Sequence, residues 1–129
     1  MANPNIVSVA TINGESVGYN LTATTTTTLL TVSSGKLLKI NRIVCANVDG
    51  TNAADLSLSI TKANFTSAGV TDFDTSGTFF LAKTISVPAD ASLVVLDTPI
   101  YLMEADVLKG GASGASDLDL FVSYEVIDD

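Results

Sequence analysis

The sequence contains no histidine and no tryptophan, and its only cysteine is Cys45. Histidine is the commonest general base and a frequent metal ligand. Without it, neither a Ser–His–Asp nor a Cys–His catalytic arrangement can be built, and zinc sites made of Cys and His are excluded. A single cysteine forms no internal disulfide, and its position in an apolar run predicts a small buried side chain. We therefore expect neither an enzyme nor a cofactor-binding protein.

Targeting and phosphate-binding signals are also missing. The chain has neither a GxxxxGK[ST] nor a GxGxxG motif. Its first residues do not show the basic and apolar regions of a secretory signal, and no apolar run reaches the length of a membrane-spanning helix. We expect a protein made in a cytoplasm, with no membrane partner.

Positive charge is scarce, since six basic residues face fourteen acidic ones and give a net charge of −8. Residues 1–83 hold five bases and five acids, whereas residues 84–129 hold Lys109 and nine acids. Nucleic acids and anionic membranes require patches of Lys and Arg. The charge therefore argues against both partners. It leaves open either a solvated acidic face or an acidic rim that meets a basic partner.

Paired carboxylates are the remaining chemistry to consider, because glycosidases need only two. Three pairs have i, i+2 spacing, which on a strand places both carboxylates on one outer face: Asp72/Asp74, Glu104/Asp106 and Asp117/Asp119. Sugar-binding sites also use aromatic platforms, and tryptophan is absent. We expect the tyrosines and phenylalanines to be consumed by the core, which argues against both a glycosidase and a carbohydrate-binding module.

Asp49, Asn52 and Asp55 are weak candidates for a calcium site, because they place oxygen atoms in a tight loop. Calcium takes six to eight oxygen ligands, and this loop offers few. A turn whose Asp and Asn side chains cap their own backbone explains the pattern better. We therefore predict no metal.

The residues that are abundant, Thr, Val, Ser, Ile and Leu, favour β-strands. Alternation with a period of two predicts strands in which Leu56, Leu58 and Ile60, and the even-numbered residues from Leu118 to Val126, face the core. Their odd-numbered neighbours, Ser59 and Phe121 among them, then face outward, and Phe121 indicates that this outer face is itself covered. In the strand Lys36–Val48, Arg42 falls on the face of Leu38, Ile40, Val44 and Ala46, which predicts a bulge near Arg42.

Further strands are predicted at Ile6–Ile12, Val17–Thr24, Thr27–Val32, Phe79–Val87, Ser92–Leu96 and within Ile100–Lys109. Turn signals separate them at Asn13-Gly14 as a hairpin, Ser33–Gly35, Asp49–Asn52, Val87–Asp90 and Gly110–Gly114. Eight or nine short strands at this spacing predict a single all-β domain over residues 1–129, an antiparallel β-sandwich of jelly-roll type. The polar connection Asn64–Gly77 is the candidate for an exposed binding loop.

Three stretches resemble small virion structural proteins of tailed phages that infect cyanobacteria and marine bacteria: SGKLLKINRIVCANVDGTNAADLSLSI (34–60), FFLAKTISVPADASLVVLDTPIYLMEADVL (79–108) and GASDLDLFVSYEVI (114–127). Together they cover more than half of the chain. The resemblance implies a place in the virion, on the head, neck or tail, with other virion proteins such as the major capsid protein as partners. It implies no active site.

We therefore expect a homo-oligomeric capsid decoration, or cement, protein, with a trimer as one option. The alternatives are a tail, neck or fibre protein that contacts the host surface, and a carbohydrate-binding module. Residues 1–12 form either a first strand or an interacting N-terminal arm. The residues expected to make contacts are Ile6, Val7 and Val9 in that segment, and Phe65, Val70 and Phe73 in the long loop.

Overall fold

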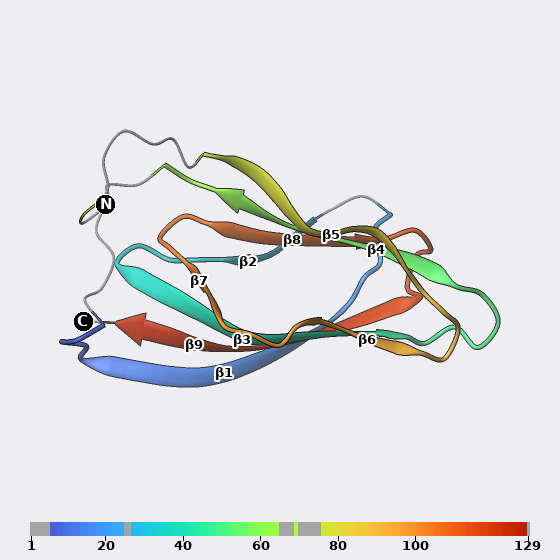
Figure 1. The fold of residues 1–129 in the computed structure, drawn as a ribbon, viewed down its shortest axis with the longest axis horizontal. Helices are drawn as coiled ribbons and strands as arrows, with labels where there is room; N and C mark the ends of the chain where they lie inside the picture. Colours follow the sequence, from blue (N-terminus) through green and yellow to red (C-terminus); the bar gives the residue numbers. More distant parts are fainter. Residues whose placement is uncertain (1–5, 25–26, 65–68, 70–75, 129) are drawn as a thin grey trace.

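The computed structural model of the protein describes residues 6–24, 27–64, 69 and 76–128, and these ranges contain nine strands and no helix (Figure 1). The strands are β1 Thr11–Asn20, β2 Thr27–Thr31, β3 Lys36–Asn47, β4 Ala54–Lys62, β5 Gly77–Val87, β6 Ser92–Leu96, β7 Ile100–Leu102, β8 Val107–Ala112 and β9 Leu118–Asp128. The predicted fold class and number of strands are confirmed. No helix in these ranges is long and apolar enough to cross a membrane.

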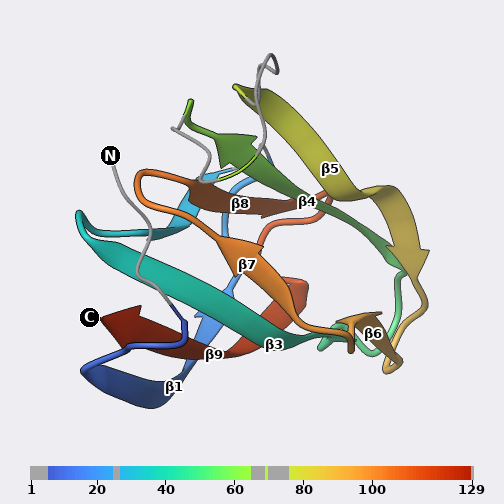
Figure 2. The ribbon, with the colours of Figure 1, turned by 60° about the vertical axis from the view of Figure 1, so that its left-hand side comes forward.

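The strands form two antiparallel sheets that pack face to face (Figure 2). Sheet A has the order β1-β9-β3-β6, with β7 also paired to β3, and sheet B has the order β2-β8-β4-β5. Alternate side chains of each sheet point into the space between them, as the period of two requires. The predicted antiparallel β-sandwich is confirmed.

Small and aliphatic side chains fill the core, and none of the buried side chains in the described ranges is aromatic. They are Leu21, Val32, Leu38, Ile40, Ile43, Cys45, Ala54, Leu56, Leu58, Ile60, Ala82, Val87, Leu102, Leu108, Ala112, Leu118, Leu120 and Val122. The expectation that the core consumes the aromatic residues is wrong for the described phenylalanines. Phe79, Phe80 and Phe121 are 54%, 46% and 54% exposed.

The predicted hairpin at Asn13-Gly14 is wrong, because β1 continues through both residues. The ladder to β9 is unbroken from Thr11 opposite Asp128 to Asn20 opposite Asp119. A tight hairpin of this type needs positive φ angles at both central residues, and neither residue has one. Ten continuous backbone pairings outweigh the local turn preference, so the two strands predicted here are one.

The bulge predicted near Arg42 is confirmed, since the pairing of β3 with β9 shifts register between Ile40 and Arg42. A one-residue shift exchanges the two faces of a strand. After the bulge, Ile43 and Cys45 are therefore buried, whereas Val44 is partly exposed. The prediction that Val44 and Ala46 face the core is wrong, because it carried the register through the bulge unchanged.

Gly110 and Gly111 lie within β8 and not in the predicted turn, which occupies residues 113–117. A Cβ atom on Gly110 would lie 2.9 Å from Leu29 Cδ1 and 3.3 Å from Leu58 Cδ1. A side chain at position 110 would therefore displace Leu29 from its place against the core. Three of the other predicted turns lie in loops, namely Ser33–Gly35, Asp49–Asn52 and Val87–Asp90, the last of which begins at the final residue of β5.

The predicted alternation holds in β4 and in the first half of β9, where Leu56, Leu58 and Leu120 are buried. Ser59 is the exception on the outer face of β4, because it is fully buried. It lies between Lys109 of β8 and Phe80 of β5 in the sheet. Alternation predicts that the Ser59 side chain points outward, but it does not predict that the larger side chains of its neighbours cover it.

Candidate assembly surface

The N-terminal residues expected to make contacts precede β1. Ile6 is 58% exposed and Val7 is 91% exposed, whereas Val9 is half-buried. The segment meets the end of β9, where the Ala10 amide donates a hydrogen bond of 2.8 Å to the Asp128 carbonyl. Residues 6–10 are not a strand, so the predicted strand Ile6–Ile12 is wrong and their role as a contact arm stays a prediction.

Phe65, Val70 and Phe73 lie outside the described residues. The end of β4, which leads into this loop, is held by a carboxylate that the sequence pattern misplaced. Asp106 is completely buried, and it accepts hydrogen bonds from the amides of Ala63 at 2.9 Å and Met103 at 2.8 Å. It also forms an ion pair with Lys62. Asp106 therefore ties the β7–β8 turn to the end of β4.

The expectation that Glu104 and Asp106 share an exposed face of a strand is wrong, because both lie in the turn between β7 and β8. Glu104 accepts hydrogen bonds from Ser34 Oγ at 3.3 Å and from the Gly35 amide at 3.1 Å. The two carboxylates therefore have separate hydrogen-bond partners. Asp106 is buried because of its place in the turn, and not because of strand alternation.

The calcium candidates cap their own loop. Asp49 accepts hydrogen bonds from the Thr51 amide at 2.8 Å and the Asn52 side chain at 3.2 Å. These bonds, the backbone one first, lower the pKa of Asp49. Asp55 lies on β4, where its amide donates a hydrogen bond to Ser113 Oγ. Within the described ranges, no group of three or more His, Cys, Asp or Glu side chains is arranged to hold a metal ion.

Cys45 is fully buried on β3, as the sequence predicts. Burial, and to a smaller extent the negative charge of Asp119, raise the pKa of its thiol to about 11. A thiol of this pKa carries almost no thiolate at neutral pH, which is the reactive form. Cys45 is a packing residue.

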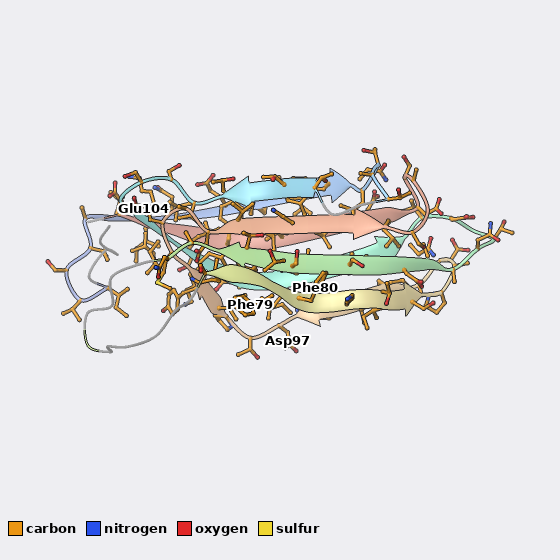
Figure 3. All side chains as sticks on the ribbon, turned by 90° about the horizontal axis from the view of Figure 1, so that it is seen from above. Phe79, Phe80, Asp97 and Glu104 are labelled. Atoms are coloured by element: carbon orange, nitrogen blue, oxygen red, sulfur yellow. The ribbon has the colours of Figure 1, made fainter. Side chains whose placement is uncertain are left out.

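Strand β5 carries the largest run of exposed apolar side chains in the described chain: Phe79, Phe80 and Leu81 follow one another and are 54%, 46% and 39% exposed. β5 is an edge strand of sheet B. Figure 3 shows Phe79 and Phe80 along the same margin of the molecule as Asp97, whereas Glu104 lies at one end. The Lys83 ammonium lies 5.1 Å from the centre of the Phe80 ring. We call these three apolar residues and Lys83 the β5 edge.

A second apolar feature lies on the outer face of sheet A. Phe121 pairs with Gly18 on one side and with Val44 on the other, so the three form a row across β1, β9 and β3. An open hollow of about 310 Å³ lies beside this row, and Ala46, Asn20 and Asp119 complete most of its lining. We call it the Gly18 hollow. The described residues leave Phe121 exposed, so the expected cover over this outer face stays a prediction.

The exposed phenylalanine rings of the described residues do not share one face. Phe79 pairs with Ile60, which faces the core, and Phe80 pairs with Ser59, which faces away from it, so the two rings are on opposite faces of β5. Phe121 is on the outer face of the other sheet. Nothing in this arrangement favours the carbohydrate-binding alternative.

No protein-family model and no curated protein sequence matches the chain. Among solved structures, the chain is similar to one described with the words "Bacillus endospore appendages form a novel family of disulfide-linked pili". The TM-score is 0.45 at 12% sequence identity, and the match covers 92% of this chain and 87% of the other.

Proposed function

We propose that the protein is a structural component of a bacteriophage particle, and that it decorates the head by packing against the major capsid protein. A tail, neck or fibre position is the alternative. The resemblance of three stretches to phage virion proteins supports the assignment, and so does the distribution of apolar side chains. The proposed activity is adhesion between protein surfaces, without chemistry.

The observation that carries the proposal is the position of the phenylalanines. The core is aliphatic, and Phe79, Phe80 and Phe121 are about half exposed. Exposed aromatic side chains are enriched at protein interfaces, where one ring buries a large apolar area at little entropic cost. A β-sandwich that places its rings on an edge and on an outer face is suited to hold neighbouring proteins together.

The experiment is gold-antibody labelling of phage particles purified from the source of the sequence, viewed by electron microscopy. Label distributed over the head supports decoration. Label confined to the tail or neck overturns decoration in favour of the alternative position. Intact particles that bind no label, while the same antibody detects the protein in lysed particles or cells, contradict a surface role in the virion.

A further inference from the structure

Two long sheet edges are open on opposite sides of the sandwich. β1 has ten residues and β5 has eleven, whereas β2 and β6 have five each and β7 has three. In the part of the chain that the structure describes, β1 pairs with β9 alone and β5 with β4 alone. Figure 2 shows β5 and β1 on opposite sides. Long open edges are templates for another strand, and short ones are not.

The β5 edge is the more apolar of the two. Phe80 faces away from the core of its own molecule, since it pairs with the outward-facing Ser59. Its ring is nearly half exposed, and Lys83 beside it is the only charged residue of β5. Monomeric proteins protect such an edge with charges, prolines or bulges. β5 has bulges after Phe80 and near Thr84, so its unprotected stretch is Gly77–Phe80.

The β1 edge offers the complementary shape. Gly18 lies in its second half and has no side chain, so the Phe121 ring behind it is reached from the edge of the sheet. A Cβ atom at Gly18 would touch Phe121 Cδ1 at 3.4 Å. A cross-strand aromatic residue placed over a glycine near a sheet edge is a known stabilising arrangement. Phe121 already covers Gly18 in this way, and the apolar hollow beside that ring is open to a second ring from a neighbouring strand.

The charges of the two edges are opposite. Glu15 is the only charged residue of β1, and Asp119 lies at the rim of the Gly18 hollow. In an antiparallel alignment, setting Phe80 opposite Gly18 pairs the regular stretch Gly77–Phe80 with the end of β1. Lys83 follows beyond the bulge of β5, and it comes opposite Glu15, or opposite Ser16 if the bulged residue Leu81 is skipped. Opposite charges that face each other across a strand pair are favourable, and like charges are not.

We propose that β5 of one copy adds antiparallel to β1 of a second copy, with Phe80 in the Gly18 hollow and Lys83 beside Glu15. Pairing β1 with β1 brings two acidic edges together, and pairing β5 with β5 leaves the hollow empty. The inference rests on the proposed structural function, because it names a second copy as a partner of the same β5 edge. Two different surfaces meet, so each copy uses both, and repetition gives a closed ring or a filament.

The test is the self-association of the full chain, measured by sedimentation velocity and native mass spectrometry over a concentration series. We expect oligomers larger than a dimer. Lys83→Glu alone and Glu15→Lys alone each weaken association about tenfold, because each sets like charges against each other. An equimolar mixture of the two variants restores it, because each contact again joins opposite charges.

Two further substitutions test the shape. Phe80→Ser removes the ring and weakens association roughly 30-fold, as expected for an aromatic residue at the centre of an interface. Gly18→Val fills the hollow with a side chain of β1 and also weakens association, although it leaves β5 unchanged. Val48→Ser is the matched control, since Val48 is 53% exposed but lies outside both surfaces. Circular dichroism melts confirm that each variant is folded.

A protein that stays monomeric at all concentrations overturns the inference, and so does a mixture that fails to restore association. Loss with Lys83→Glu but not with Glu15→Lys indicates β5–β5 pairing and also overturns it. The two proposals fail separately. Gold label on particles with a monomeric protein removes only the self-association, whereas self-association without label on particles removes only the virion function.

Discussion

The two ends of strand β4 are held by polar side chains in opposite ways. At its end, Asp106 is fully buried and accepts two amide hydrogen bonds besides its ion pair with Lys62. Before its start, Asp49 is only half-buried and caps its own loop, while the neutral amide of Asn47 is buried. A charge can be removed from water only if its oxygens are fully satisfied. One end of β4 is thus held by a buried carboxylate, that of Asp106, and the other by a buried neutral amide, that of Asn47.

The buried Asn47 makes the second end rigid without a charge. Its side-chain nitrogen donates to the carbonyls of Val87 at 2.9 Å and Asn52 at 3.0 Å, and its oxygen accepts from the Asp49 amide at 2.9 Å. These bonds join the end of β3, the following loop and the end of β5. A neutral amide can satisfy both donors and acceptors, which a carboxylate cannot.

Removing the charge at the Asp106 end is the largest expected effect. Asp106→Ala leaves two partly buried amides and Lys62 without this acceptor, and we expect a loss of roughly 3–5 kcal/mol in the free energy of unfolding measured with urea. Glu104→Ala is the control, because Glu104 lies in the same turn but is only half-buried. Equal losses for the two variants would show that burial of the carboxylate is unimportant.

Removing the amide at the other end is expected to cost less. Asn47→Ala leaves two carbonyls and one amide without this partner, for a loss of about 2–3 kcal/mol in the same measurement. Asn52→Ala serves for comparison, since its side chain makes an exposed bond to Asp49. A larger loss in the free energy of unfolding for Asn47→Ala than for Asp106→Ala would contradict the expected order.

Both ends show the limit of the sequence. Alternation identified β4 and most of β9, since pairing with neighbours on both sides enforces a period of two. It failed at Asp106, because the residue lies in a turn where strand periodicity does not apply. The turn signal at Asn13-Gly14 failed for another reason, because ten pairings to a strand about a hundred residues away override it. The exposure of Phe79 and Phe80 could not be predicted either, because edge position depends on the order of strands in each sheet, whereas alternation did predict that Phe121 faces outward.

Alkaline pH tests the core that lies between the two ends. Because the pKa of Cys45 is raised to about 11 by burial, its contribution to stability is complete below the unfolded pKa, about 8.5, and is lost as the pH rises towards 11. We expect the free energy of unfolding to fall by about 2 kcal/mol between pH 8 and 10.5, measured by urea titration at each pH. Burial also raises the pKa of Tyr19 and Tyr124, which adds a loss of the same sign above pH 10. Cys45→Ala should remove the slope between pH 8.5 and 10; an unchanged slope would assign it to other groups.

The smallest effect is expected at Asp49, which is only half-buried and whose carboxylate accepts hydrogen bonds only from its own loop. Its lowered pKa means that its contribution is present above the ordinary pKa of an aspartate and is lost as the pH falls through the lower folded value. Asp49→Ala should lower the urea midpoint less than Asn47→Ala does, and Asp49→Asn should retain most of the wild-type midpoint at pH 7, because an amide oxygen can still accept from Thr51. In acid the wild type and Asp49→Asn should converge. If Asp49→Asn were as damaging as Asp49→Ala at pH 7, the negative charge itself would be what the loop requires, and the contrast between a charged and a neutral end would no longer hold.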